Sequence, residues 1–390
     1  MDGVGKIMGK NDMIKKCGMV TLYDDNFGTC LQAFALYTKI KEFGYEPTII
    51  RYARAEKNNS QGNRMKLKLK KLMKASPMML LNYALSYKNI RDRKEGFSKF
   101  RNKYLNFTEE INYRNSITDA TATSFDGYVC GSDMIWSEEF VKDWDYFFMK
   151  FAPMGKRIAY APSFGKSEIS INNRDLCEEL IKGITCISCR EEAGATMINQ
   201  YYGIDVKQVL DPTLLMEKDE WNTLIKSETP MLNEKYILTY VFGGLTGSRK
   251  KIFTQIETKN WGNHKIIPMN KSQYGKGSVD GILGPEEFIN LYRHAEFIIT
   301  DTFHGMIFAL IYEKPFVVLK REDGGHWAKY SDRMTSTLSM LGLEERYINN
   351  MTVIPDSFKE LDYTPINKIL RQKRAESLKY LRNSLEEVMR

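Results

Sequence analysis

Residues 295–321 read AEFIITDTFHGMIFALIYEKPFVVLKR, and this stretch decides the fold class. Two short apolar runs, 297–299 and 315–319, flank a segment of helix length, which is the pattern of a βαβ unit. The polar turn after the first run contains Asp301, Thr302 and His304. Because open α/β sheets bind ligands at the carboxyl ends of their strands, this turn is a candidate site.

His304 permits two interpretations at this point. It is either a hydrogen-bonded turn residue or a catalytic group, and one histidine in a loop does not decide between them. Gly305 behind it would let another group approach closely. Lys320 and Arg321 end the second apolar run on the same edge of the predicted sheet.

Four apolar runs upstream end in small or polar residues, with helical patterns between several of them. The residues at these predicted strand ends include Ser132, Asp133, Ser163, Arg190 and Asp211. Such repetition is typical of a doubly wound parallel sheet. A second unit with the same rhythm begins after Met216, so we predict an α/β protein with two doubly wound Rossmann-like domains.

The first of these units opens with a predicted strand at 17–22, a polar turn and a helix that ends near Gly44. The turn carries Asn26 and Gly28, and the free N–H groups of the helix that follows suit an anion. The turn lacks the glycines of a dinucleotide-binding fingerprint and the lysine of a phosphate-binding loop, so neither cofactor is indicated. A turn that only caps the helix is the alternative.

A length of 390 residues suits two domains that each bury a core. We predict a disordered lead at 1–15, an N-terminal α/β domain at 16–215 and a C-terminal α/β domain at 216–360. A final helix at 361–390 is predicted to pack back on the N-terminal domain. The composition, with 43% hydrophobic and 27% charged residues, is that of a soluble globular protein.

Cysteine usage and hydropathy favour the cytoplasm. Six scattered cysteines do not form a secreted disulfide framework. Neither a signal peptide nor an apolar run of about 20 residues, as a membrane span needs, is visible. Cys186 and Cys189 have a Cys-x-x-Cys spacing, but in a predicted strand positions three apart face opposite sides, so we predict no metal site.

The net charge of +8 comes from one segment. Residues 64–104 hold 13 Lys and Arg against two acidic residues, and the remaining chain sums to −3. This basic amphipathic segment, part of a predicted insertion at 60–104, suits peripheral contact with an anionic membrane at the inner face of the cell. A segment that only covers a domain surface is the alternative. No nucleic-acid recognition motif accompanies the charge, so no nucleic-acid partner is predicted.

Seven motifs in order resemble the polysaccharide pyruvyl transferase family. They are NFGTCLQAFAL from Asn26, YVCGSDMIWS from Tyr128, IAYAPSFG from Ile158, SCRE from Ser188, DPTLL from Asp211, ITDTFHGMIFAL from Ile299 and KPFVVLKR from Lys314. The resemblance runs from about 17 to 343 and implies two α/β domains facing a cleft, as in GT-B glycosyltransferases. It also implies transfer of pyruvate from phosphoenolpyruvate to two hydroxyls of one sugar, which gives a cyclic ketal and phosphate and requires no cofactor. In bacterial members the acceptor is commonly a lipid-linked or polymeric glycan of the cell envelope.

The resemblance also implies roles for individual residues. His304 matches the family's histidine and is the predicted general acid that protonates the methylene carbon. Arg190 matches its arginine, and convergent cations would hold phosphate and carboxylate. Asp133 and Asp301 are predicted to orient His304 or to accept hydroxyl protons. The other predicted substrate-binding residues are Asn26, Gly28, Ser132, Ser163, Thr302, Lys320, Arg321 and Arg333.

Thr302 departs from those family members that carry arginine two residues before the histidine, so Lys320 or Arg321 would have to contact the phosphate instead. Two other functions stay open. One is a GT-B-type glycosyltransferase with a nucleotide-sugar donor, which needs a nucleotide pocket in the second domain. The other is a non-catalytic, membrane-docked component of a capsule-assembly complex.

Overall fold

A computed structural model of the chain describes residues 14–52, 77–111, 124–225, 229–242, 247–258, 264–269, 284–321, 332–349 and 353–390. Most of the predicted lead at 1–15, and the part of the predicted basic insertion before Pro77, lie outside the described residues. Among the described residues, no helix is both long and apolar enough to cross a membrane.

The first half of the chain builds a sheet of seven parallel strands. They are β1 (Lys16–Val20), β2 (Glu46–Tyr52), β3 (Phe107–Ile111), β4 (Gly127–Gly131), β5 (Arg157–Tyr160), β6 (Cys186–Cys189) and β7 (Lys207–Gln208). Their spatial order is β3-β2-β1-β4-β5-β6-β7, and every pairing is parallel. The order reverses between β1 and β4, which makes their carboxyl ends the switch point of this sheet.

Helices cover this sheet and connect its strands. They are α1 (Phe27–Glu42), α3 (Pro77–Tyr104), α5 (Trp144–Phe147), α6 (Ile171–Ile181) and α7 (Glu192–Tyr202), with the 3-10 helices η1 (Glu138–Asp143) and η2 (Pro212–Leu215). β4 carries no charged residue and is entirely buried, as expected for a central parallel strand with both faces covered.

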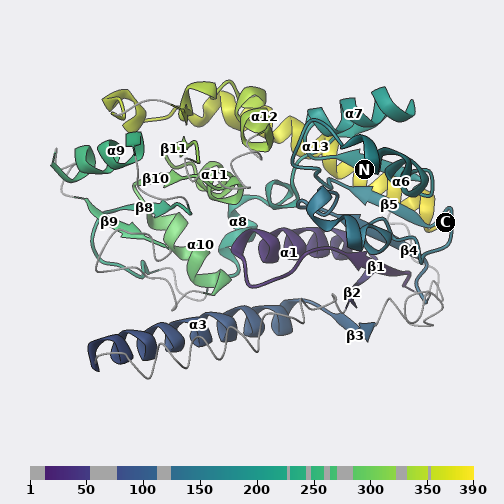
Figure 1. Cartoon of the computed structure of the whole chain (residues 1–390), viewed down its shortest axis with the longest axis horizontal. Helices are drawn as coiled ribbons and strands as arrows, with labels where there is room; N and C mark the ends of the chain where they lie inside the picture. Colours follow the sequence, from purple (N-terminus) through teal and green to yellow (C-terminus); the bar gives the residue numbers. More distant parts are fainter. Residues whose placement is uncertain are drawn as a thin grey trace, which may run out of the picture.

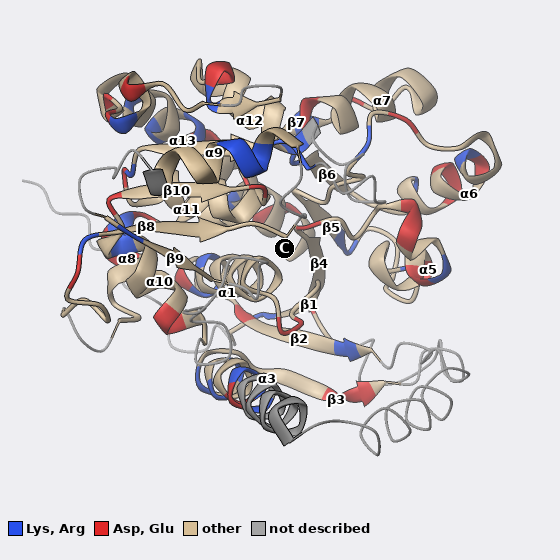
Figure 2. Cartoon of the chain, turned by 60° about the vertical axis from the view of Figure 1, so that its left-hand side comes forward, with Lys and Arg blue, Asp and Glu red and all other residues tan. Residues whose placement is uncertain are grey.

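The second sheet has five strands, β8 (Tyr236–Tyr240), β9 (Lys265–Pro268), β10 (Phe297–Thr300), β11 (Phe316–Leu319) and β12 (Tyr347–Ile348). Their order is β12-β11-β10-β8-β9, again with parallel pairing and with its switch point between β8 and β10. In Figure 2 the inner strands β8 and β10 are uncharged along their length. The surrounding helices are α8 (Lys218–Asn222), α9 (Gly247–Thr258), α10 (Pro285–His294), α11 (Phe303–Ile311), α12 (Asp332–Leu341) and α13 (Tyr363–Val388), with η5 (Glu344–Arg346) and η6 (Asp356–Lys359).

The predicted fold class is confirmed: two doubly wound α/β units, of seven and five parallel strands, form the molecule. Several predicted elements are shorter than expected. The strand predicted at 183–189 begins at Cys186, and the one predicted at 206–210 is the two-residue β7. The edge strands β3 and β12 were not predicted.

Helix α1 carries the contact between the two units. It packs on α10 and α11 of the second unit, and the rings of Phe27 and Phe288 stack with centroids 4.5 Å apart. One hydrophobic cluster therefore runs from the first sheet into the second. Figure 1 shows α1 between the two sheets, with α3 lying along one edge of the molecule.

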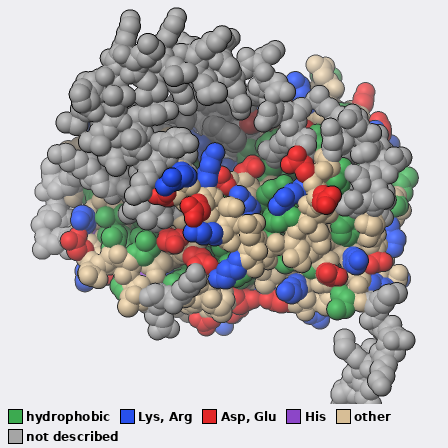
Figure 3. All heavy atoms as spheres, turned by 90° about the horizontal axis from the view of Figure 1, so that it is seen from below, with side chains coloured by type: hydrophobic (Ala, Val, Ile, Leu, Met, Phe, Trp, Pro, Cys, Tyr) green, Lys and Arg blue, Asp and Glu red, His purple; other side chains and the backbone are tan. Residues whose placement is uncertain are grey.

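Helix α3 is tied to the body of the protein by ion pairs. Arg101 Nη1 lies 2.8 Å from Asp25 Oδ1, and Lys103 Nζ lies 3.1 Å from Glu286 Oε1. In the face seen from below in Figure 3, the described Lys and Arg side chains stand beside Asp and Glu. Part of the positive charge at the end of the predicted basic segment is thus paired with carboxylates.

Helix α13 leaves the second unit and returns to the first. Near its start the Tyr363 hydroxyl donates to the Lys314 carbonyl at 2.7 Å, and further along Ser377 Oγ accepts from the backbone N–H of Leu210 at 3.0 Å. After the helix ends, the Met389 carbonyl accepts from Lys15 Nζ. One helix therefore bridges both sheets.

Candidate active site

His304 is the second residue of α11 and is 8% exposed. The helix begins after Thr302, whose Oγ1 accepts a hydrogen bond from the backbone N–H of Gly305 at 3.0 Å. A Cβ on Gly305 would lie 2.2 Å from Thr300 Oγ1, so this tight turn requires glycine. Thr302, predicted to contact substrate, thus caps the helix and thereby fixes the position of His304 in its first turn.

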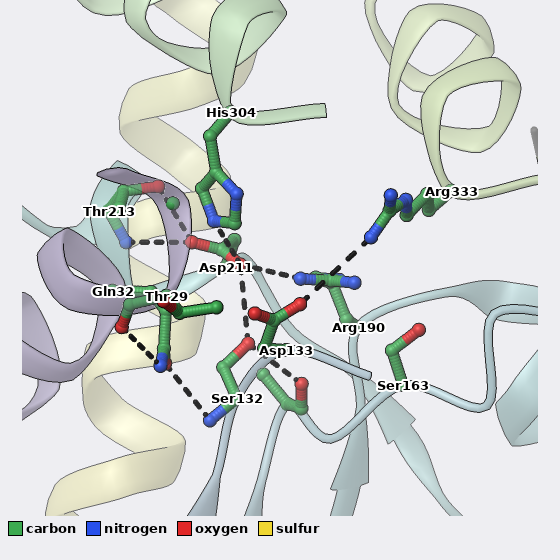
Figure 4. Close-up of polar contacts among 12 residues, drawn as sticks. Thr29, Gln32, Ser132, Asp133, Ser163, Arg190, Asp211, Thr213, His304 and Arg333 are labelled. Carbon is green, nitrogen blue, oxygen red and sulfur yellow. Dashed lines mark hydrogen bonds and ion pairs between the residues drawn. The ribbon is translucent and has the colours of Figure 1, made fainter. Parts of the chain in front are cut away.

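The carboxylate that contacts His304 is Asp211, which the sequence placed at a strand end but which was not selected for the site. Its Oδ2 lies 3.6 Å from His304 Nε2 and 2.9 Å from Arg190 Nη1, and it accepts a hydrogen bond from Ser132 Oγ at 3.2 Å (Figure 4). Its Oδ1 accepts from the N–H and the hydroxyl of Thr213. Burial would raise the pKa of this carboxyl, but His304 and Arg190 hold the pKa well below its usual range. Asp211 is therefore an ionised group shared by the predicted acid and the predicted arginine.

Arg190 follows β6 directly and its side chain is 2% exposed. Its Nε lies 3.2 Å from Glu191 Oε1, and the same oxygen accepts a hydrogen bond from Ser163 Oγ at 2.5 Å. Burial disfavours the charged guanidinium, yet Glu191 and Asp211 raise its pKa above the ordinary value. Within the described part of the chain its buried Nη2 has no hydrogen-bond partner. A charged donor left without a partner is suited to a bound anion.

Arg333 brings a second guanidinium to the same place. Its Cζ lies 5.6 Å from the centroid of the Phe303 ring, and the Cζ of Arg190 lies 4.4 Å from the same centroid. Burial, with Arg190 adding like-charge repulsion, lowers the pKa of Arg333 to about 10. Its Nε is buried without a hydrogen-bond partner among the described residues. Two like charges thus converge on one ring, one from each unit.

Asp133 of the first unit faces Arg333 of the second. Its Oδ1 lies 3.9 Å from Arg333 Nη1 and accepts a hydrogen bond from the backbone N–H of Met134 at 2.9 Å (Figure 4). Its backbone has φ of 65°, which is unusual for a residue other than glycine. Such strained positions cluster at functional sites, because the surrounding structure must hold them in place.

The start of α1 lies against His304. Asn26 caps this helix by accepting from the N–H of Gly28 at 2.9 Å and of Thr29 at 3.4 Å. A Cβ on Gly28 would come within 2.1 Å of His304 Nδ1, so only glycine allows the helix this close to the imidazole. Asn26 and Gly28, predicted as substrate-binding residues, are placed beside the predicted acid.

Gln32, one turn further along α1, connects the two strands of the first switch point. Its Nε2 donates to Thr21 Oγ1 at 2.9 Å after β1, and its Oε1 accepts from the N–H of Ser132 at 3.2 Å after β4 (Figure 4). The side chain is fully buried. Gln32 therefore holds the loop that presents Ser132, a connection that sequence reasoning did not identify.

Asp301 lies at the second switch point in a cluster of its own. Its carboxylate pairs with Arg249 Nη2 at 3.1 Å and Arg321 Nε at 3.5 Å, and accepts from the N–H of Phe242 at 2.9 Å. Lys320 contributes its carbonyl, which accepts from Arg249 Nε at 2.9 Å, while the residue is exposed. Of the two aspartates predicted to orient His304, neither makes that contact; Asp301 instead holds two arginines.

For two of the site residues that were not predicted, the sequence contained a local signal. Asp211 and Glu191 both follow predicted strands, and both lie in the motifs DPTLL and SCRE. Arg249 carried no such signal, because it lies inside a helix whose burial the sequence does not give. Among the described residues, no three His, Cys, Asp or Glu side chains are grouped closely enough to hold a metal ion.

Comparisons with known proteins identify a family and a fold. The family model described as polysaccharide pyruvyl transferase matches residues 26–323. A search of curated proteins found no match. Among solved structures, a UDP-N-acetylglucosamine 2-epimerase from Listeria monocytogenes aligns with TM-score 0.51 and 10% identity over 95% of this chain and 91% of its own. MnaA from S. aureus, solved with UDP, aligns with TM-score 0.50 and 11% identity over 94% and 91%. These likenesses establish the fold with two facing Rossmann-like units.

Proposed function

Because the chain belongs to the polysaccharide pyruvyl transferase family, we propose that it moves pyruvate from phosphoenolpyruvate to two hydroxyls of one sugar. The proposed products are a cyclic pyruvate ketal and inorganic phosphate. The acceptor we propose is a sugar of a cell-envelope glycan, carried on a lipid or within a polymer.

The observation that supports this donor is that the guanidinium carbons of Arg190 and Arg333 lie 4.4 and 5.6 Å from the centroid of the Phe303 ring. The Arg190 side chain is 2% exposed and that of Arg333 is 14% exposed, and each has a buried nitrogen without a hydrogen-bond partner among the described residues. Phosphoenolpyruvate carries phosphate and carboxylate on a small carbon frame. Its binding would relieve the repulsion between the two arginines and supply acceptors for their unpaired donors.

The proposed reaction begins with a proton transfer to the methylene carbon of phosphoenolpyruvate, which leaves positive charge on the neighbouring carbon. One sugar hydroxyl adds to that carbon and releases its proton. The bond from that carbon to the phosphate oxygen then breaks, and the second hydroxyl adds and releases its proton. Of the two protons released, one replaces the proton used on the methylene carbon and one is left with the phosphate.

His304 is the group we propose as the proton donor. The Asp211 carboxylate lies on its Nε2 side at 3.6 Å and orients the imidazole ring. Its Nδ1 lies on the side of Gly28, where the absence of a side chain lets α1 pack against the ring. In this assignment Asp211 is a positioning residue, because it acts on the reaction through His304.

Asp133 is the carboxylate we propose as the acceptor of a hydroxyl proton. It comes from the first unit and lies beside Arg333 of the second, so a sugar held between the units would meet it next to the bound donor. Asp301 has a different part in the proposal. By pairing with Arg249 and Arg321 it fixes the strand ends from which the second unit meets the donor.

The test is incubation of the purified protein with phosphoenolpyruvate and a panel of glycans, including a lipid-linked galactoside. Phosphate release that depends on the acceptor, with a product whose mass has increased by one pyruvate ketal, is the expected result. A parallel reaction replaces phosphoenolpyruvate with sugar nucleotides. Transfer of sugar in that reaction, with no acceptor-dependent phosphate release in the first, would overturn the proposal in favour of a glycosyltransferase.

A further inference from the structure

A groove of about 900 Å³ runs between α7 of the first unit and α12 of the second. Thr196 and Gln200 line it from α7, Ser336 and Ser339 line it from α12, and Gln208 of β7 lies between them. In Figures 1 and 2 both helices lie on the same side of the molecule, with β7 between them in Figure 2. Neither the motifs of the sequence nor the residues assigned to the donor account for this groove.

The lining of the groove is chemically selective. Most of the side chains are uncharged hydroxyls and amides, which both donate and accept hydrogen bonds. Met197 and Met340 add small apolar surfaces. Among the described lining residues the one cation is Lys373, which already pairs with Glu376 at 3.3 Å. Such a lining fits neither a phosphate nor a lipid chain, whereas sugar hydroxyls and the C–H faces of sugar rings match both parts of it.

The groove meets the proposed donor site through two residues. Gln208 Nε2 donates to the Arg190 carbonyl at 3.3 Å and to Ser336 Oγ at 3.4 Å, so it joins the groove to the arginine and the two units to each other. Glu192, which also lines the groove, follows Glu191, whose carboxylate binds Arg190. One end of the groove therefore lies beside the backbone of Arg190.

We infer that this groove, the α7–α12 groove, binds the neutral sugar residues of the acceptor that adjoin the sugar receiving pyruvate. The inference rests on the proposed function and extends it: the enzyme recognises an oligosaccharide or polymer and not a single sugar. The volume is in the range of small-molecule sites of about 300–1,000 Å³. Its position between the units means that both contribute to acceptor recognition.

The inference is tested with acceptors of increasing length. The KM of the parent protein is expected to fall as sugars are added to a monosaccharide acceptor, since the added sugars fill the groove. In the double variant Thr196→Ala/Gln200→Ala the KM for the longer acceptors is expected to rise by about five- to tenfold, from the loss of two hydrogen-bonding groups. The KM for phosphoenolpyruvate serves as the internal reference and is expected to stay within twofold.

A second variant fills the groove with an aromatic ring and removes a single hydroxyl. Thr196 is exposed on α7. The substitution Thr196→Phe is expected to raise the KM for long acceptors to that for short ones. Gln372→Ala is the matched control, because Gln372 is exposed on α13 beside Lys373 but does not line the groove. Unchanged KM for long acceptors in both groove variants, or an equal rise in the control, would overturn the inference.

Failure of the proposed function would be recognised separately. In that case the parent protein releases no phosphate with any acceptor, and the groove is tested by titrating neutral oligosaccharides into the parent and the Thr196→Phe variant in a calorimeter. Binding by the parent that the variant lacks supports a glycan site. Absence of binding by the parent contradicts it.

Discussion

Gly28 and His304 are in contact across the two units, and a Cβ on residue 28 would come within 2.1 Å of the imidazole Nδ1. Gly28 lies in the first turn of α1 and His304 in the first turn of α11. The place of the imidazole is therefore set by the docking of two helices from different sheets. Neither unit alone forms the site.

The substitution Gly28→Ala tests this contact. The added methyl group is expected to displace the imidazole, and because small misplacements of reacting groups are costly, kcat should fall by about 10- to 100-fold. Helix content, followed by circular dichroism, should not fall, since alanine is a better helix former than glycine.

The contact itself is checked by a double-mutant cycle. Overpacking by the methyl group is expected to lower the free energy of unfolding by about 1–3 kcal/mol in the parent. In a His304→Ala background the same change should cost clearly less, because the obstructing ring is gone. Equal costs in the two backgrounds would show that Gly28 and His304 are not coupled.

His304→Gln should remove the proton donor while keeping a side chain of similar length. We expect kcat for phosphate release to fall by about 10²- to 10⁴-fold, the range for loss of a general acid, with little change in the KM for phosphoenolpyruvate. Steady-state phosphate release measures both constants. Retention of the parental kcat would remove His304 from the mechanism.

Asp211→Asn should change stability in a pH-dependent way. The folded state holds the pKa of Asp211 below its unfolded value of about 3.9, because His304 and Arg190 outweigh the opposing effect of burial. The carboxylate therefore stabilises the fold above about pH 4, and this contribution is lost as the pH falls further.

The expected size follows from its buried partners. At pH 7 the variant should lose about 3 kcal/mol of unfolding free energy, since Arg190 keeps its charge but loses a buried counter-ion. Urea unfolding of parent and variant, repeated from about pH 7 down to about pH 3, should show this difference shrinking below about pH 4. A difference that stays constant over this range would exclude a paired carboxylate at position 211.

Arg333→Gln should weaken donor binding. Arg333 converges with Arg190 on Phe303, so its loss is expected to raise the KM for phosphoenolpyruvate by about tenfold, as for one charge-assisted hydrogen bond. Lys320→Gln provides the comparison, because Lys320 is exposed and the contacts described for it are made by its backbone N–H and carbonyl. A larger effect at Lys320 than at Arg333 would place the donor nearer the Asp301 cluster.

Local sequence patterns predicted much of the fold. The sequence predicts a helix over 332–341 and a helix start at Pro285, and α12 and α10 lie there, because start signals and periodicity act over a few residues. β7 is shorter than predicted since η2 begins at Pro212, soon after it, and proline interrupts strand pairing.

The site was predicted less fully, for a physical reason. His304 and Arg190 could be selected because each is a conspicuous polar residue at a strand end, but Asp211 reaches His304 only after two sheets dock. The role of Thr302, in contrast, depends on local structure alone. Its Oγ1 accepts from the Gly305 N–H within one turn, so a helix cap could have been proposed from the sequence in place of substrate contact.

Helix α13 has a consequence for how the chain folds during synthesis. The first sheet is made of residues up to Gln208, yet Gly127 of β4 packs on Met389 and the Leu210 backbone bonds to Ser377. While the ribosome is still making the second sheet, the first one lacks this cover and exposes apolar surface. The N-terminal unit should therefore become protease-resistant only after residues near 390 have emerged, although its strands are made first.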